Sequence, residues 1–101
     1  MAQSAIGILE TKGLVPLIQG TDAMLKAANV ELVGEMKQVG SALVSATITG
    51  DVAAVKAALD AGEDAANQIG KVISAHLIAR PQDETAKLLP SAKATSGKKG
   101  S

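Results

Sequence analysis

Residues 51–70 read DVAAVKAALDAGEDAANQIG, and this stretch decides the fold because it carries the clearest periodicity in the chain. Asp51 is placed to cap the start of a helix and Gly70 to end it. Apolar and small residues between them recur at steps of three and four, which is typical of one face of an amphipathic helix: Val52, Val55, Leu59, Gly62, Ala66 and Ile69.

Strand patterns lie on both sides of this helix. Ser4–Glu10 alternates between two faces, with Ile6 and Ile8 on one and Ala5, Gly7 and Leu9 on the other. Apolar spacing and turn residues predict four more elements, namely a helix over about 14–28 and strands over 30–39, 43–49 and 72–80.

This order, β-α-β-β-α-β, predicts an α+β protein of the ferredoxin-like, split β-α-β kind. Its sheet should have four antiparallel strands, with two helices on one face. Gly7 and Gly62 lie inside elements, where each glycine costs about 0.5–1 kcal/mol relative to alanine. Such a cost indicates close contact at both positions, either of helix on sheet or of chain on chain.

Composition excludes several classes of protein. The 101 residues include one histidine, no cysteine and no aromatic residue. Disulfides, thiolate metal sites and base-stacking surfaces are therefore not expected. No apolar run is long enough to span a membrane, and residues 1–4 lack the features of a secretion signal. We expect a soluble intracellular domain without nucleic-acid or lipid-membrane partners.

Charge divides the chain into two parts. Residues 1–90 carry seven basic and ten acidic residues and are expected to form a single domain. Residues 91–101 contain Lys93, Lys98 and Lys99 and no acid, and their other residues are small or polar. Because such a segment has no apolar surface to bury, we expect a disordered basic tail.

No pattern of residues indicates a catalytic site. His76 lies in the middle of a predicted strand, and no serine has an obvious partner that would make it a nucleophile. Asp60, Glu63 and Asp64 fit the solvated face of the second helix. We therefore expect no catalytic residues, no metal site and no cofactor.

Four segments, in order, resemble a known family. They are AIGILETKGL at 5–14, DAMLKAANV at 22–30, GDVAAVKAA at 50–58 and HLIARP at 76–81. They are similar to segments of the bacterial microcompartment shell proteins of the single-domain, hexamer-forming kind. The resemblance covers about residues 4–90 and leaves out the tail.

The resemblance implies a structural function in the bacterial cytoplasm. Six copies would form a ring, and rings would tile into the protein shell of a microcompartment together with other shell proteins, including pentameric vertex proteins, around encapsulated enzymes. Gly40, Ser41 and Ala42 would line a central pore for small polar metabolites, while Lys26 and Arg80 would lie at the hexamer edge. The turn itself carries no charge, so pore selectivity is expected from size and hydrogen bonding.

The chain departs from the family pattern in three places. Ala79 and Gln82 stand where the family usually has Pro and His, and Ala42 stands where it usually has Gly. The segment 34–40 is one residue longer than the family pattern, which predicts a one-residue bulge near residues 35–36.

Two other functions remain open from the residues alone. Ferredoxin-like folds also serve as small-molecule-binding regulatory domains, since a fold does not fix a function. An enzyme assembled at a subunit interface, with His76 as its base, is the other alternative. Sheets, tubes or six-fold rings in electron micrographs would favour the shell protein over both.

Overall fold

The computed structural model describes residues 3–40 and 42–80, so the predicted tail at 91–101 lies outside the described residues. The chain contains two helices and five strands in these ranges: β1 (Ser4–Lys12), α1 (Leu14–Ala27), β2 (Glu31–Leu32), β3 (Lys37–Val39), β4 (Leu43–Asp51), α2 (Val52–Ile69) and β5 (Lys71–Ala79). No helix among the described residues is both long and apolar enough to cross a bilayer.

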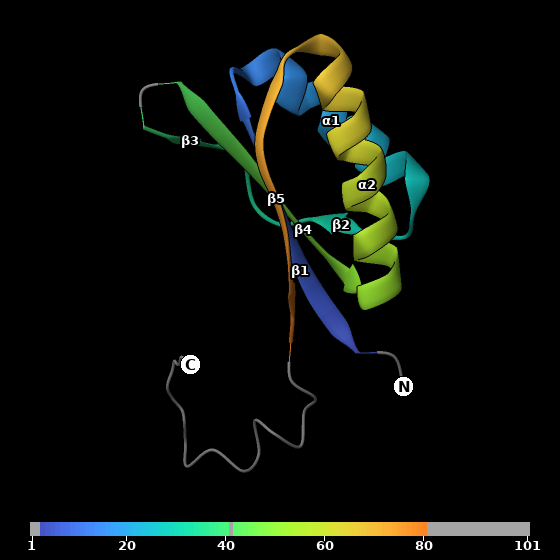
Figure 1. Cartoon of the computed structure of the whole chain (residues 1–101). Helices are drawn as coiled ribbons and strands as arrows, with labels where there is room; N and C mark the ends of the chain where they lie inside the picture. The colour runs from blue at the N-terminus through green and yellow to red at the C-terminus, as the bar shows by residue number, and fades with distance from the viewer. Residues whose placement is uncertain (1–2, 41, 81–101) are drawn as a thin grey trace, which may run out of the picture.

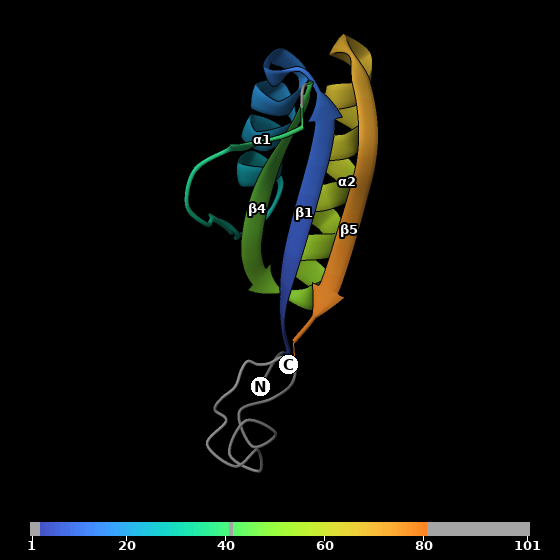
Figure 2. The same cartoon turned by 90° about the vertical axis from the view of Figure 1, so that its left-hand side faces the viewer.

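The strands form one antiparallel sheet in the order β2-β4-β1-β5, and β3 also pairs with β4. Both helices cover the same face of this sheet, and no helix or strand of the described residues covers the other face (Figures 1 and 2). The predicted fold class is therefore confirmed.

The strand count differs from the prediction because the second strand is divided into β2 and β3. Glu31 pairs with Thr49 and Lys37 with Ser45, so the chain advances six residues while its partner strand advances four. The prediction of a one-residue bulge here was wrong, since the interruption holds two extra residues. Two extra residues preserve the alternation of a strand, so Glu31 and Lys37 lie on the same face of the sheet.

A one-residue irregularity does occur, but it lies between β1 and β5. Glu10 pairs with Ser74, whereas the next residue, Thr11, pairs with Val72, so Ile73 is the extra residue. Because of this shift, Val72 pairs with Thr11 and Lys71 pairs with Lys12 at the end of β1.

Glycines set the spacing between the helices and the sheet. A Cβ atom at Gly20 of α1 would lie 2.7 Å from Leu9 Cδ2 and 3.0 Å from the carbonyl oxygen of Gly62 in α2. A Cβ atom at Gly7 of β1 would lie 2.7 Å from Val55 Cγ1. The contact predicted at Gly7 is thus helix on sheet, and that at Gly62 is helix on helix.

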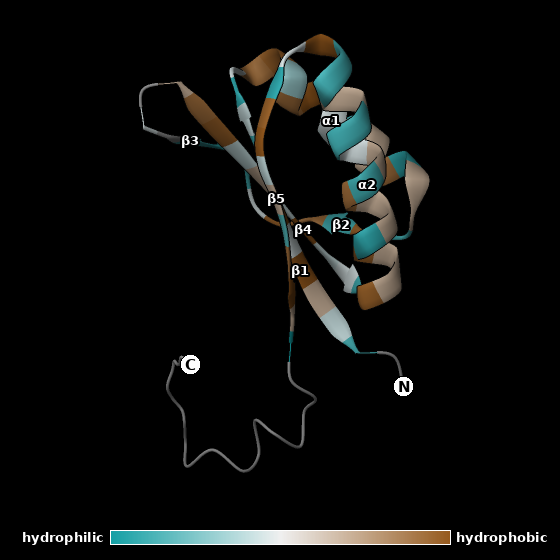
Figure 3. Ribbon diagram, viewed as in Figure 1, coloured by the Kyte–Doolittle hydropathy of each residue, from teal (hydrophilic) through white to brown (hydrophobic). Residues whose placement is uncertain are grey.

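The core lies between the sheet and the helices and consists mainly of small and medium side chains. Its residues are Ala5, Leu9, Leu17, Met24, Val30, Ala46, Ile48, Val55, Ala58, Leu59 and Ala66. Figure 3 shows the matching pattern on α2, where apolar and hydrophilic segments alternate along the helix.

The ends of α2 agree only in part with the sequence analysis. Gly70 ends the helix as predicted, and its N–H donates a hydrogen bond to the carbonyl oxygen of Ala66 (2.9 Å). Asp51 holds the N-cap position as predicted, but its side chain makes no capping hydrogen bond. The N–H of Val52 instead donates to the carbonyl oxygen of Gln3 (2.9 Å), which satisfies this helix donor from outside the helix.

We expect Gly62→Ala to destabilise the protein although alanine favours helices. The added methyl group would collide with Met24 in α1, and overpacking of this kind costs about 1–3 kcal/mol. The melting temperature, measured at fixed protein concentration, should fall by roughly 5 °C or more. Ala57→Ser adds one atom on the exposed side of α2 and should change it little. An unchanged or higher melting temperature for Gly62→Ala would contradict this account of the helix contact.

Candidate assembly surfaces and pore hairpin

The predicted pore residues lie at the hairpin between β3 and β4. Gly40 is exposed with φ of 75°, a backbone conformation that favours glycine, and apart from its chain neighbours no atom of the described residues lies within 4 Å of the place where its Cβ would stand. Ala42 is exposed, and its carbonyl oxygen accepts a hydrogen bond from the N–H of Gly13 (2.8 Å). Ser41 lies outside the described residues. The hairpin therefore borders open space and is tied to the turn between β1 and α1.

Lys26 lies in the last turn of α1, where a positive charge interacts favourably with the helix dipole. Its Nζ is 3.0 Å from Asp22 Oδ2, and the two side chains are 77% and 56% exposed. Exposed ion pairs of this spacing contribute only about 0.3–0.5 kcal/mol. The ammonium group is thus on the surface and available for a stronger partner.

Arg80 follows the last residue of β5. Its N–H donates to the carbonyl oxygen of Ser4 (2.9 Å), and its own carbonyl oxygen accepts a hydrogen bond from Gln3 Nε2 (2.9 Å). These two contacts fix the backbone while the residue as a whole remains exposed.

The predicted edge residues and the predicted pore residues lie toward different ends of the sheet. Lys26 lies at the end of α1, and the chain then enters β2, where Glu31 pairs with Thr49 near the end of β4. Arg80 follows Ala79, which pairs with Ala5 near the start of β1. The hairpin lies at the opposite end of β4, as Figure 1 shows. The structure therefore separates Lys26 and Arg80 from the hairpin.

The uncovered face of the sheet carries bulky apolar side chains. Ile6 stands between Thr49 and Ile78, and Ile8 stands between Thr47 and His76. The exposed fraction of Ile78 is 53%, and Ile6 and Ile8 are half-buried. The sequence showed the alternation in β1 but not which side the helices would cover, so this apolar face was missed.

A second apolar surface lies on α1, on the side that faces neither the sheet nor α2. While Leu17 and Met24 are fully buried, the outer residues are exposed by 43–63%: Leu14, Val15, Ile18 and Leu25. We call these four residues the α1 outer stripe. Several exposed apolar side chains on one helix mark an interaction surface more often than a solvated one.

Among the described residues, no hydrogen bond or ion pair joins His76 to a second side chain. It is exposed on the open face of β5, and the nearby Ser74 Oγ donates its hydrogen bond to Glu10 Oε1 (2.7 Å). The described residues contain no group of three histidine, aspartate or glutamate side chains that could hold a metal ion.

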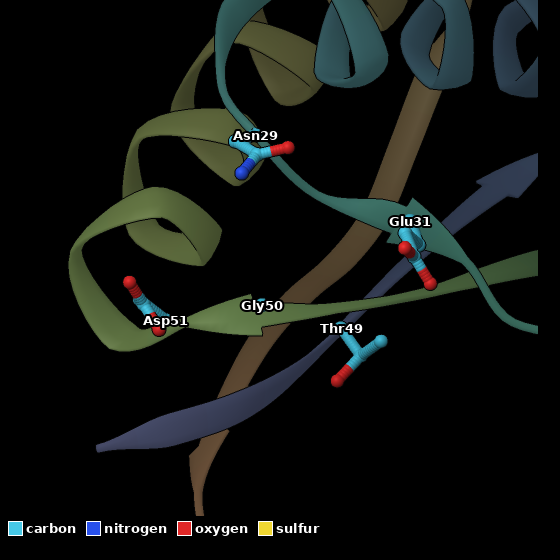
Figure 4. A pocket seen from close by; sticks show the side chains of 5 residues that line it. All are labelled: Asn29, Glu31, Thr49, Gly50 and Asp51. Atoms are coloured by element: carbon cyan, nitrogen blue, oxygen red, sulfur yellow. The ribbon is translucent and has the colours of Figure 1, made fainter. Parts of the chain in front are cut away.

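One polar pocket of about 280 Å³ opens where β2, the end of β4 and the start of α2 meet (Figure 4). It is lined by Asn29, Glu31, Thr49, Gly50 and Asp51. The hydroxyl of Thr49 donates to the carbonyl oxygen of Ala5 (3.2 Å), and both carboxylates are exposed. The pocket carries negative charge but has no buried polar group that would orient a ligand.

Comparison with known proteins identifies the family of this chain. The family model described as BMC domain matches residues 5–81, which is most of the chain. The chain belongs to the BMC-domain family.

The similar proteins are shell proteins. Over 86 residues the chain is 52% identical to the bacterial microcompartment shell protein EutM of Salmonella typhimurium, covering 85% of this chain and 88% of the relative. Identity to the shell protein PduA of Citrobacter freundii is 52% over 90 residues, covering 89% and 96%. The major carboxysome shell protein of Halothiobacillus neapolitanus is 46% identical over 89 residues, covering 87% and 90%.

A solved structure supports the same conclusion. The chain superimposes on a microcompartment protein from Desulfitobacterium hafniense with a TM-score of 0.71 and 31% identity, covering 93% of this chain and 51% of that one. The chain therefore spans about half the length of that structure. The resemblance to single-domain shell proteins inferred from the sequence is confirmed, and the relatives favour a structural role over a regulatory one.

Proposed function

We propose that this BMC-domain chain forms hexameric rings that tile edge to edge in the shell of a microcompartment in the bacterial cytoplasm. It acts there with other shell proteins, including pentameric vertex proteins, around encapsulated enzymes, and it catalyses no reaction itself. Family membership supports the shell role. One observation on this chain supports the proposed self-assembly: its own fold leaves two apolar surfaces uncovered.

The two surfaces are different and suit a heterologous contact. One is the open sheet face with Ile6, Ile8 and Ile78, and the other is the α1 outer stripe. When one surface of a copy packs on the other surface of the next copy, the contact repeats around an axis, and it closes into a ring when six equal rotations complete a full turn. Burial of large aliphatic side chains contributes about 1.5–3 kcal/mol each, so several such residues per contact stabilise the ring substantially.

Tiling of rings then depends on the rim, where Lys26 and Arg80 lie. Lys26 has a long aliphatic stem that can lie along a neighbouring ring while its ammonium group binds backbone carbonyl oxygens. Its ion pair with Asp22 is weak enough to be given up for such a contact.

We expect Lys26→Ala to abolish extended sheets while rings persist, as seen by electron microscopy of the purified protein. Asp22→Ala is the matched control, because it removes only the ion pair within the chain and should leave sheets intact. Sheets of unchanged extent in Lys26→Ala would show that the edge assignment is wrong. Loss of the rings themselves would place Lys26 in the ring contact instead.

The pore is assigned to the hairpin Gly40–Ala42. In a ring, six hairpins meet at the axis, and Gly40 permits close approach of the backbone. Six hydroxyl groups of Ser41 can each donate a hydrogen bond to a passing polar solute. The pore would thus admit small polar metabolites.

Ser41→Leu should slow the flux of a small polar solute through intact shells without changing their assembly, because it narrows the pore and removes the hydroxyl donors. The measurement is uptake of the solute by shells in which this chain is the only pore-forming protein. Ser41→Thr keeps a hydroxyl and serves as the control. Equal flux through Ser41→Leu and wild-type shells would refute the role of Ser41.

A further inference from the structure

The start of β1, the end of β5 and the start of α2 meet at one end of the molecule (Figures 1 and 2). Gln3 lies there, directly before β1. Its backbone carbonyl oxygen accepts a hydrogen bond from the N–H of Val52, the first residue of α2 (2.9 Å). Its side-chain Nε2 donates a hydrogen bond to the carbonyl oxygen of Arg80, 77 residues further along the chain (2.9 Å). Gln3 therefore joins the start of α2 to the end of β5.

The backbone that carries the Gln3 side chain is held on both sides. The next residue, Ser4, pairs with Asp51 of β4, and its carbonyl oxygen accepts the N–H of Arg80 (2.9 Å). Together with the hydrogen bond from Val52, these contacts keep the start of β1 in one place. The amide of Gln3 is thus already placed beside Arg80, and a pre-organised donor loses less conformational freedom when it binds.

Arg80 depends on this support because its side chain has no partner within the described residues. Its guanidinium forms no ion pair and donates no hydrogen bond in residues 3–40 and 42–80. Pro81 follows in the sequence, and a residue before proline is restricted to extended conformations. The direction of the guanidinium is therefore set by the Arg80 backbone, which lies just beyond the end of β5, where strand pairing frays most easily.

We propose that Gln3 is a positioning residue for the ring edge, where its side-chain amide holds the Arg80 backbone so that the guanidinium is presented to a neighbouring ring. This inference rests on the proposed tiling through Arg80. A guanidinium group is planar and donates hydrogen bonds in fixed directions, so its contacts are sensitive to the placement of its backbone. Any freedom that the free ring leaves to Arg80 must be lost when two rings meet, which weakens the contact.

Gln3→Met tests this role, because methionine keeps the length of the side chain but has no donor. Rings should form as in the wild type, as counted by native mass spectrometry. The lowest protein concentration at which sheets appear in electron micrographs should rise by roughly fivefold, the factor that corresponds to one net hydrogen bond. Gln68→Met makes the same change at an exposed glutamine near the other end of α2 and should leave this concentration unchanged.

Two further measurements separate positioning from a general effect on stability. Gln3→Lys restores a donor of similar reach and should return the concentration for sheet formation toward that of the wild type. Hydrogen exchange in rings kept below that concentration should be faster in Gln3→Met at residues 77–80 and unchanged in the middle of β1. A role confined to stability would instead speed exchange throughout the ring and lower its melting temperature.

Arg80→Ala distinguishes failure of this inference from failure of the proposed function. Sheets of unchanged extent in Arg80→Ala would overturn the edge assignment of Arg80 and the role of Gln3 together. If Arg80→Ala loses its sheets while Gln3→Met forms them at the wild-type concentration, only the positioning role is overturned. A defect of Gln3→Met that Gln3→Lys does not relieve, with faster exchange throughout the ring, would also overturn it.

Discussion

The structure depends on the close approach of α1, α2 and the sheet at Gly20, Gly62 and Gly7. No side chain fits at these three positions, since a Cβ atom at each glycine would enter the space of a core residue or of backbone. On β1, Ala5, Gly7 and Leu9 face the helices, while Ile6 and Ile8 of the same strand face outward. Large aliphatic side chains thus remain outside the core of one copy, although burial of such side chains is a main source of stability.

These outward-facing apolar residues link folding to assembly. The chain leaves Ile78 on the open sheet face and the α1 outer stripe uncovered. A second copy can bury both kinds of surface, so much of the stability of the protein should come from contacts between copies. In the proposed ring, the separation of the hairpin from Lys26 and Arg80 would place the hairpin at the centre and these two residues at the outer edge.

Local patterns predicted most of the fold, and contacts between strands account for what they missed. The periodicity of residues 52–69 and the alternation in 4–10 are local, so both were recognised from the sequence. The two-residue interruption between β2 and β3 depends on pairing with β4, and the meeting of Lys12 with Lys71 depends on the extra residue Ile73. Such registers are set by distant residues. The predictions of edge and pore residues came from family resemblance, because exposed lysine, arginine and serine carry no distinguishing local pattern.

The central claim is that two different surfaces of this chain pair around an axis. Native mass spectrometry of the purified full-length protein at low micromolar concentration tests it most directly, since it counts the copies in the smallest stable assembly. The account predicts six copies, with little monomer because the isolated chain leaves its large apolar residues uncovered. A stable monomer, or a dimer or trimer whose melting temperature rises with a small-molecule ligand, would contradict it.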